Sequence, residues 1–199
     1  MYRVIFLILL FSPFYSFCQV KPSQLLDNYC SLNTDTLVKA KGLNLKFFYP
    51  CDWEISEGQR PNVVKTFSYV IPKDTMSANI TFTVKNLHTK SNKSQADRLY
   101  TIEYLKEVAE DLGKYINGRK VVVDGWPAGE TEIELTREVA AGKMTMYMVN
   151  YLLVYEDKTI SVIYGIGGLN PQKAKEYFDK YKLVFKAYFF KTVILSQYS

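Results

Sequence analysis

The stretch MTMYMVNYLLVYEDKTISVIYGI, residues 144–166, decides the class of the fold. Both of its ends are rich in β-branched and aromatic residues, which favour strands. Only Glu156, Asp157 and Lys158 separate the two runs, and so short a connection joins strands that run antiparallel. We therefore predict a hairpin of residues 144–155 and 159–166 within a mainly antiparallel sheet.

Five further segments upstream of this hairpin are predicted to be strands. Apolar and hydroxyl side chains alternate over residues 80–84, so one face of that strand is expected to be buried. A polar loop is expected to follow it. The other four segments are residues 43–47, 63–70, 120–124 and 130–137. Together with the hairpin, they predict a central sheet of about seven strands.

Two long helices are predicted, one inside the strand order and one after it. The first is expected to begin near Ser94, to carry an apolar stripe over residues 99–116 and to end at Asn117-Gly118. The second is expected to begin where Asn170 precedes Pro171, because an asparagine cap and a proline in the first turn favour a helix start. Strands interrupted and then closed by helices indicate an α+β fold.

The first residues have the three parts of a secretory signal. Arg3 precedes an apolar run over residues 4–11, and the small residues Ser16 and Cys18 stand before a cleavage point. We therefore predict that residues 1–18 are a signal peptide and that the exported chain is periplasmic or extracellular. A membrane anchor is one alternative, although the run is shorter than the roughly 20 residues of a spanning helix. A lipoprotein modified at Cys18 is the other.

The rest of the chain is predicted to comprise a polar N-terminal segment, residues 19–41, and one domain, residues 42–199. Hydrophobic residues make up 48% of the sequence and charged residues 23%, which is typical of a globular protein. The net charge of +5 is spread along the chain without a long basic block. We therefore expect no nucleic-acid partner. Because the leader is expected to be cleaved, we also expect no transmembrane anchor in the mature form.

Cys30 and Cys51 are the two cysteines that follow the leader. In an exported chain, such a pair favours a disulfide, with two separate thiols as the alternative. The single histidine, His88, lacks the partners that zinc binding or nucleophilic catalysis requires. We therefore predict no metal, no cofactor and no catalytic residues.

Several short motifs together resemble the PsbP-like superfamily, which includes the PsbP subunit of photosystem II and the Ran-binding protein that shares its fold. They are the Tyr49-Pro50 pair with Trp53 three residues on, the strands at residues 62–67 and 80–84, and the run VVVDGWPA at residues 121–128. The resemblance extends from about residue 40 to the end. It implies an α/β/α sandwich and a non-catalytic binding or accessory role. The photosynthetic role is not implied, because no thylakoid transit peptide is visible.

Tyr49, Trp53 and Trp126 are the candidate partner-binding residues, because they flank the two turn motifs. Exposed aromatic residues near loops often supply the binding energy of an interface. The interpretation favoured for such aromatic side chains is nevertheless the core of a sheet covered on both faces. Trp126 is the expected exception, at the surface in a turn formed by residues 125–128.

Glu130, Glu132 and Glu134 alternate along one predicted strand, so they share a face at steps of about 6.5 to 7 Å. Such a row could hold a hard cation. The favoured interpretation is a polar sheet face whose carboxylates are answered by neighbouring lysines.

The leading functional prediction is a non-catalytic exported binding or accessory protein with a protein or envelope component as its partner. A carrier of a small apolar ligand is the second hypothesis, and a metal-dependent enzyme built on the glutamate row is the third. An apolar cavity that reaches the surface would support the carrier, whereas three carboxylates converging on one point would support the enzyme.

Overall fold

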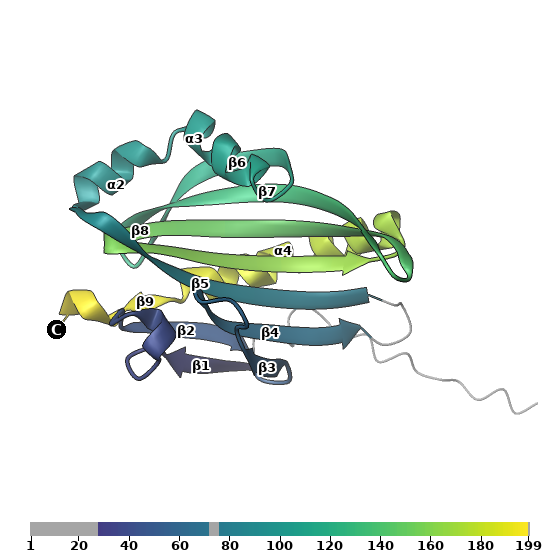
Figure 1. The fold of residues 1–199 in the computed structure, drawn as a ribbon, viewed down its shortest axis with the longest axis horizontal. Helices are drawn as coiled ribbons and strands as arrows, with labels where there is room; N and C mark the ends of the chain where they lie inside the picture. The colour runs from purple at the N-terminus through teal and green to yellow at the C-terminus, as the bar shows by residue number, and fades with distance from the viewer. Residues whose placement is uncertain (1–27, 72–75, 199) are drawn as a thin grey trace, which may run out of the picture.

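The computed structural model describes residues 28–71 and 76–198, and strands dominate them (Figure 1). One sheet has three strands in the order β1-β2-β9, and the main sheet has six strands in the order β3-β4-β5-β8-β7-β6. Every pair of neighbouring strands is antiparallel. The α+β fold with mainly antiparallel pairing is therefore confirmed, although the described strands form two sheets rather than one sheet of about seven strands. The predicted signal peptide, residues 1–18, lies outside the described residues.

The small sheet comprises β1 (Tyr29–Asn33), β2 (Leu45–Pro50) and β9 (Val193–Ile194). The main sheet comprises β3 (Glu54–Glu57), β4 (Val63–Ile71), β5 (Met76–Ser91), β6 (Lys114–Val123), β7 (Trp126–Val139) and β8 (Gly142–Gly168). The helices are α2 (Lys93–Leu99), α3 (Ile102–Glu110) and α4 (Pro171–Phe190), and two 3-10 turns are η1 (Val38–Ala40) and η2 (Leu195–Tyr198).

Strand β8 contains the hairpin that the sequence predicts. Its residues 142–153 pair with β7, and its residues 158–168 pair with β5. Glu156, which lies between the two arms, has a φ of +49°. The Ser161 hydroxyl donates a hydrogen bond to Asn150 Oδ1 at 2.8 Å, so the arms lie side by side. They form the middle of the main sheet.

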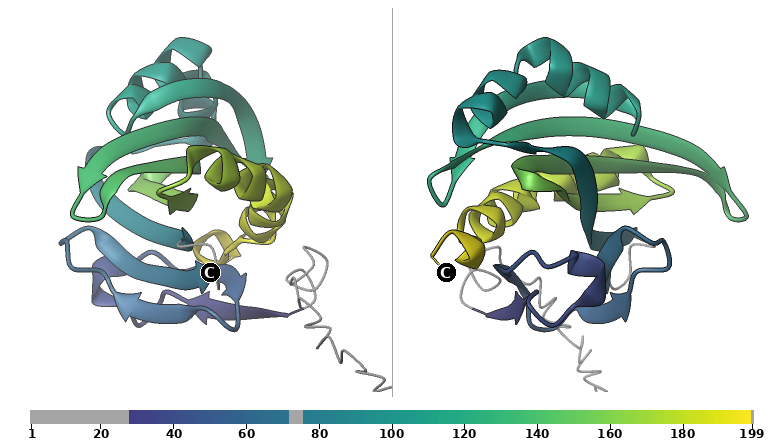
Figure 2. Two further views of the ribbon diagram at one scale, coloured as in Figure 1. Left: turned by 90° about the vertical axis from the view of Figure 1, so that its right-hand side faces the viewer. Right: turned by 60° about the vertical axis from the view of Figure 1, so that its left-hand side comes forward.

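Helices cover both faces of the main sheet. Side chains alternate along β8, so successive residues contact helices on opposite faces. Val149, Tyr151 and Leu153 belong to the large core cluster that includes the buried side chains of α4. Met146, Met148 and Leu152 instead belong to two smaller clusters with α3. The main sheet curves over α4, as Figure 2 shows. This arrangement confirms the predicted α/β/α sandwich.

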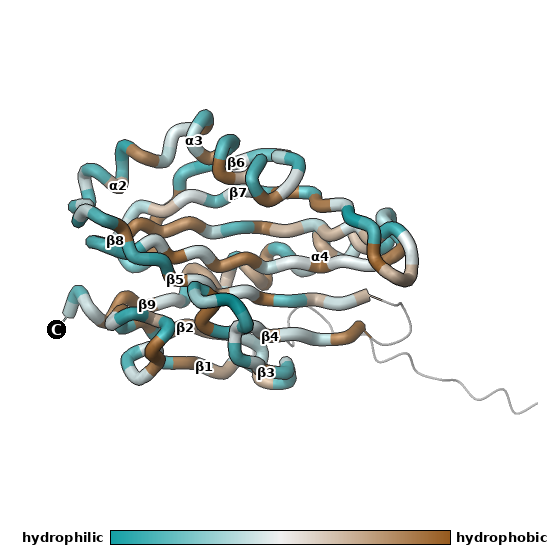
Figure 3. The backbone as a smooth tube through the Cα atoms, in the orientation of Figure 1, coloured by the Kyte–Doolittle hydropathy of each residue, from teal (hydrophilic) through white to brown (hydrophobic). Residues whose placement is uncertain are grey.

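The small sheet packs on the α4 side of the main sheet and extends the large core. The Phe47 ring of β2 lies 5.7 Å from Phe67 and 5.4 Å from Phe82, measured between ring centroids. Apolar and polar residues alternate along the first part of β5 (Figure 3), and buried and half-buried residues alternate along β2 as far as Tyr49. The alternation therefore buries one face of each strand between the two sheets.

The predicted disulfide is present. Cys30 of β1 is bonded to Cys51, which directly follows β2, and their Cα atoms are 4.9 Å apart. Residue 30 belongs to the segment that was expected to be merely polar, yet β1 pairs with β2 along its whole length. The disulfide therefore joins two strands that are already neighbours.

The prediction of one long helix over residues 94–116 is wrong. Two short helices, α2 and α3, stand there instead and divide at Tyr100-Thr101. Tyr100 is buried, and its hydroxyl accepts a hydrogen bond from the Val154 N–H at 2.7 Å. Thr101 Oγ1 accepts a hydrogen bond from the Tyr104 N–H at 3.2 Å and caps the second helix. This tertiary contact of Tyr100 interrupts the apolar stripe.

The boundaries around these helices also differ from expectation. Asn117-Gly118 lies inside β6 rather than at a helix end, because β6 pairs with β7 from Lys114 onward. The expected polar loop after residue 84 is instead a continuation of β5, which pairs with β8 as far as Ser91. Helix α2 is capped by Asn92, whose side chain accepts from the Gln95 N–H, rather than by Ser94. The helix predicted at Asn170-Pro171 is confirmed.

The chain closes with a polar contact between a hairpin tip and the last described residues. Asp124, in the turn between β6 and β7, accepts hydrogen bonds at Oδ2 from the Ile194 N–H at 2.8 Å and from Gln197 Nε2 at 2.7 Å. The Tyr198 hydroxyl donates to Asp124 Oδ1 at 2.8 Å. One side chain therefore holds β9 and η2 against the main sheet. Across residues 28–71 and 76–198, no helix has both the length and the apolar character needed to cross a bilayer.

Candidate functional site

Two of the three predicted partner-binding aromatic residues are core residues. Tyr49 and Trp53 are 9% and 6% exposed, because β2 and the turn after it face the main sheet. The Trp53 ring stacks on Tyr69 and meets Phe185 edge-on. These two side chains therefore hold the two sheets and α4 together.

Trp126 is half-buried and packs on the large core. The chain reverses at Asp124 and Gly125, whose φ values are +46° and +72°, so Trp126 is the first residue of β7 rather than part of the turn. Its indole Nε1 donates to the Val154 carbonyl at 2.6 Å, and its ring meets Tyr155 edge-on at 4.8 Å. An Asp-Gly pair suits a two-residue hairpin turn, which places the turn earlier than expected.

Basic side chains pair with or lie opposite the three glutamates of the row. Glu130 Oε1 accepts a hydrogen bond from Arg119 Nε at 2.6 Å, and Glu132 Oε1 lies 3.4 Å from Lys182 Nζ. Lys114 stands opposite Glu134 in the pairing of β6 with β7. Within the two described ranges, no three or more His, Cys, Asp or Glu side chains gather in a way that could hold a metal ion.

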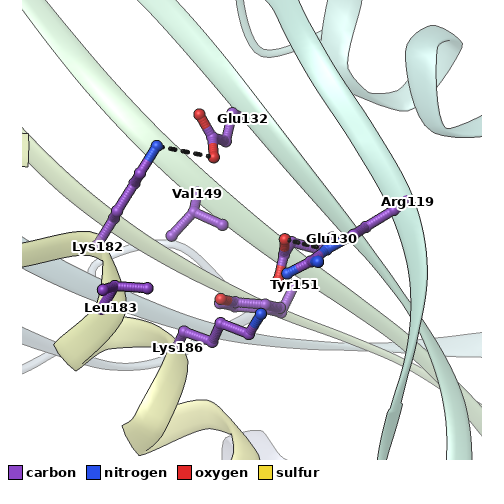
Figure 4. Close-up of a pocket in the computed structure, with 8 residues that line it drawn as sticks. All are labelled: Arg119, Glu130, Glu132, Val149, Tyr151, Lys182, Leu183 and Lys186. Atoms are coloured by element: carbon purple, nitrogen blue, oxygen red, sulfur yellow. Dashed lines mark hydrogen bonds and ion pairs between the residues drawn. The ribbon is translucent and has the colours of Figure 1, made fainter. Parts of the chain in front are cut away.

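These charged side chains line a pocket of about 100 Å³ between α4 and the sheet, partly open to solvent. Strands β6, β7 and β8 form its floor, and α4 forms one wall (Figure 4). The residues that line it are Arg119, Glu130, Glu132, Val149, Tyr151, Lys182, Leu183 and Lys186.

Strand register explains how the floor is assembled. Glu130 pairs with Arg119 of β6 on one side and with Tyr151 of β8 on the other, and Glu132 pairs with Val149. Residues two apart on a strand point to the same face, so both carboxylates face α4. On α4, Lys182 and Lys186 are four residues apart and share one side of the helix. Figure 4 shows these side chains converging from the sheet and from α4.

Glu130 is the most deeply buried charge of the pocket. The residue is 6% exposed, whereas the Arg119 side chain is 52% exposed. The hydrogen bond from Arg119 holds one carboxylate oxygen and raises the pKa of that guanidinium. Among the described residues, the other oxygen, Glu130 Oε2, has no hydrogen-bond partner. A buried acceptor in that condition is costly unless a ligand or water satisfies it.

Tyr151 forms the back of the pocket as a neutral phenol. Burial raises its pKa, and the neighbouring Glu130 carboxylate raises it further through its charge and through a hydrogen bond from the Tyr151 hydroxyl. The ring is held by Phe189 of α4, which stacks on it at 4.1 Å with an angle of 8° between the planes. Tyr151 therefore provides a rigid wall beside Glu130.

The two lysines of α4 differ in their partners. Burial disfavours the charged form of Lys182, but Glu132 and Asp179 outweigh that effect and raise the pKa of Lys182. Lys186 lies over the Phe190 ring, with its Nζ 5.6 Å from the centroid, and forms no ion pair with any residue in the described parts of the chain. The pocket therefore combines three cations with two carboxylates and has one cation in excess.

Four of the pocket's charged and polar residues were not predicted from the sequence: Arg119, Tyr151, Lys182 and Lys186. The alternation of glutamates did identify the face of β7 that forms the floor. Two lysines one helical turn apart on the last helix were a visible signal as well. What the sequence lacks is the information that α4 crosses that face, because this depends on tertiary packing.

No protein-family model matches the chain, and no curated protein matches it. Among solved structures, it is similar to LpqN, involved in cell envelope biogenesis of Mycobacterium tuberculosis, with a TM-score of 0.45 and 9% identity over 87% of this chain and 96% of LpqN. It is also similar to a structure from Bacteroides thetaiotaomicron, with a TM-score of 0.33 and 14% identity over 66% of this chain and 41% of the other. Likeness at this level carries no argument about function.

Proposed function

We propose that this chain is a non-catalytic exported binding or accessory protein of PsbP-like architecture, and that it binds an envelope component at the pocket beneath α4. The observation that carries the proposal is the buried carboxylate of Glu130, which lines this pocket and whose Oε2 has no hydrogen-bond partner among the described residues. A built pocket with an unsatisfied buried acceptor is a site where a ligand gains more than the surrounding surface can offer.

The disulfide supports a role outside the cytoplasm. Cys30 and Cys51 are bonded, and disulfides persist in oxidising compartments such as the periplasm or the cell exterior. The predicted signal peptide at residues 1–18 leads to the same compartment. Export places the pocket where envelope components are accessible.

The character of the pocket favours recognition of a polar group. Five of its eight lining residues carry a charge, so this pocket does not support an apolar ligand. Glu130 and Glu132 are each paired with a cation rather than directed at a common point. Fixed ion pairs of this kind orient a polar ligand without taking part in a reaction.

Capture from the native envelope tests the proposal. The full chain, tagged and produced with export, is incubated with envelope extract, and bound proteins, lipids and glycans are identified by mass spectrometry. The Lys182→Met/Lys186→Met variant is the test, and Lys180→Met is the control, because Lys180 lies over the rings of Tyr177 and Tyr181 and does not line the pocket.

We expect the parent and the control to retain the same component and the double variant to lose it while its melting temperature stays close to that of the parent. Recovered material should be chemically unchanged. Capture that does not depend on the pocket lysines, or conversion of the captured component into a product, contradicts the proposal.

A further inference from the structure

We infer that the pocket beneath α4 binds a small hydroxylated anion, in which a hydroxyl group lies close to a carboxylate or phosphate. In this assignment, Lys186 binds the anionic group and Glu130 Oε2 accepts the hydrogen bond of the hydroxyl. The inference rests on the proposed function, because it names the ligand class of the same site.

The charges that line the pocket favour an anionic ligand. Arg119 is paired with Glu130 and Lys182 with Glu132, which leaves Lys186 as the one cation of the lining without a carboxylate among the described residues. A ligand with a single negative charge neutralises the pocket. Hydrogen bonds between an ammonium and an anionic oxygen are also stronger than those between neutral groups.

Glu130 Oε2 favours a ligand that donates a hydrogen bond. Glu130 Oε2 is an acceptor with no partner in the described parts of the chain, and the residue is 6% exposed. A hydroxyl group satisfies this oxygen without adding charge. An ammonium group would also donate, but a zwitterion brings no net charge and leaves the excess cation of Lys186 uncompensated.

The size of the pocket and its apolar side chains suit a short hydroxylated acid. The pocket has a volume of about 100 Å³, whereas a cavity needs roughly 10 to 15 Å³ to hold one water molecule. A short carbon chain with polar groups therefore fits. Val149 and Leu183 provide the apolar contacts for such a chain. Leu183 is 70% exposed, so one side of the pocket remains open, and the end of a longer molecule can enter.

The same chemistry can come from a free hydroxy acid or from the acidic end of an envelope glycan. Calorimetric titration of the full chain with glycerate and glycerol phosphate tests the shared chemistry. Propionate lacks both hydroxyl groups of glycerate, glycerol lacks the charge, and serine is the zwitterion. We expect propionate and glycerol to bind about 10- to 100-fold more weakly than glycerate, because each loses a hydrogen bond to a charged group. Serine should also bind more weakly than glycerate, because it brings no net negative charge.

Two variants assign the roles. Lys186→Met keeps the length of the side chain and should weaken glycerate binding about tenfold or more, with less dependence on salt, whereas Lys180→Met should bind like the parent. Glu130→Gln should narrow the ratio of glycerate to propionate affinity, because a neutral amide is a weaker acceptor than a carboxylate. That ratio is insensitive to a general loss of affinity. Melting temperatures show that each variant is folded.

Equal affinities for glycerate and propionate, preference for serine, or unchanged binding by Lys186→Met overturn the inference. Competition separates the two sources: excess glycerate should displace the captured envelope component if that component presents the acidic group. Pocket-dependent capture that glycerate does not displace overturns the inference and leaves the proposed function in place. Glycerate binding without any envelope capture supports the ligand class and contradicts the envelope partner.

Discussion

Trp126 connects two backbone segments at one edge of the large core. Its indole donates to the Val154 carbonyl, while Tyr100 accepts from the Val154 N–H, so both backbone groups of one β8 residue are bonded to aromatic side chains. Part of the Trp126 ring remains exposed. A role for this residue in partner binding stays a prediction, whereas its contribution to packing follows from these contacts.

Substitution separates the two roles of Trp126. Trp126→Phe keeps the ring beside Tyr155 but loses the hydrogen bond, which should cost about 1 kcal/mol of unfolding free energy. Trp126→Ala also loses the packing and should cost about 2 to 3 kcal/mol, less than for a fully buried tryptophan. Chemical denaturation measures both values.

Val122→Ala on the same hairpin is the control, because Val122 is 56% exposed. A nearly unchanged stability of Trp126→Ala contradicts the packing role. If that variant also loses envelope capture, the exposed part of the ring belongs to an interface.

At the scale of elements, short-range chemistry was predictable and long-range contacts were not. The helix start at Asn170-Pro171 and the hairpin around Glu156 depend on a few adjacent residues, and both predictions are confirmed. The break at Tyr100 depends on a hydrogen bond to β8, which lies 54 residues further along the chain. Because the apolar spacing continues past Tyr100, it predicted neither the end of α2 nor the start of β6.

The contact at Asp124 can be tested without disturbing the turn. Asp124 has a positive φ, which glycine adopts readily, so Asp124→Gly removes the carboxylate and keeps the backbone. Loss of the hydrogen bonds from Ile194, Gln197 and Tyr198 should cost about 1 to 3 kcal/mol and should speed hydrogen exchange at the Ile194 amide. Asp124→Asn, which keeps one acceptor, should fall between this variant and the parent. Unchanged exchange in Asp124→Gly would show that β9 is held by other contacts.

The disulfide should stabilise the small sheet by restricting the unfolded chain. Its cysteines are 21 residues apart, which corresponds to roughly 3 kcal/mol in the chain-entropy treatment. The Cys30→Ser/Cys51→Ser variant should therefore melt at a lower temperature than the parent. Reductant should lower the melting temperature of the parent and leave that of the variant unchanged. A parent that is insensitive to reductant under unfolding conditions would refute this expectation.

On the scale of the whole molecule, the family resemblance implied a sheet covered on both faces, and the two-sided core agrees. Tyr49 lies on the buried face of β2 and Trp53 lies in the turn that follows β2, and both side chains belong to the core. Hydropathy assigns strand residues to a face. It does not indicate which helix crosses which strands. The pairing of Lys182 with Glu132, and with it the pocket, therefore emerged only from the three-dimensional arrangement.

The buried tyrosines make alkaline pH a test of the core. Burial raises the pKa values of Tyr100, Tyr151 and Tyr164, whereas the same phenols ionise near pH 10 in an unfolded chain. The native state therefore binds more protons than the unfolded state above that pH. Stability should be complete below about pH 10 and should fall as the pH rises towards the folded pKa values.

Phenolate absorbance and circular dichroism, followed together, measure this transition, and the buried phenols should ionise only as the fold is lost. Tyr164→Phe provides the comparison. Its hydroxyl is buried without a partner among the described residues, so removing it should shift the alkaline transition to higher pH without loss of stability at neutral pH. Gradual ionisation of all tyrosines before unfolding would contradict the expectation.

The small sheet has a consequence for the order in which the protein can be completed. Strand β2 pairs with β9, and Asn44 is joined to Ser196 by hydrogen bonds across 152 positions of the chain. If the chain is exported through a channel with its N-terminus first, as proposed, one edge of β2 therefore stays unpaired until β9 has passed. Long-range pairing of this kind is slow and leaves a strand edge open to other chains. Under the proposed export, passage through the channel and completion of the small sheet are coupled, and a chain arrested during transit retains an unpaired edge that a chaperone outside the membrane can bind.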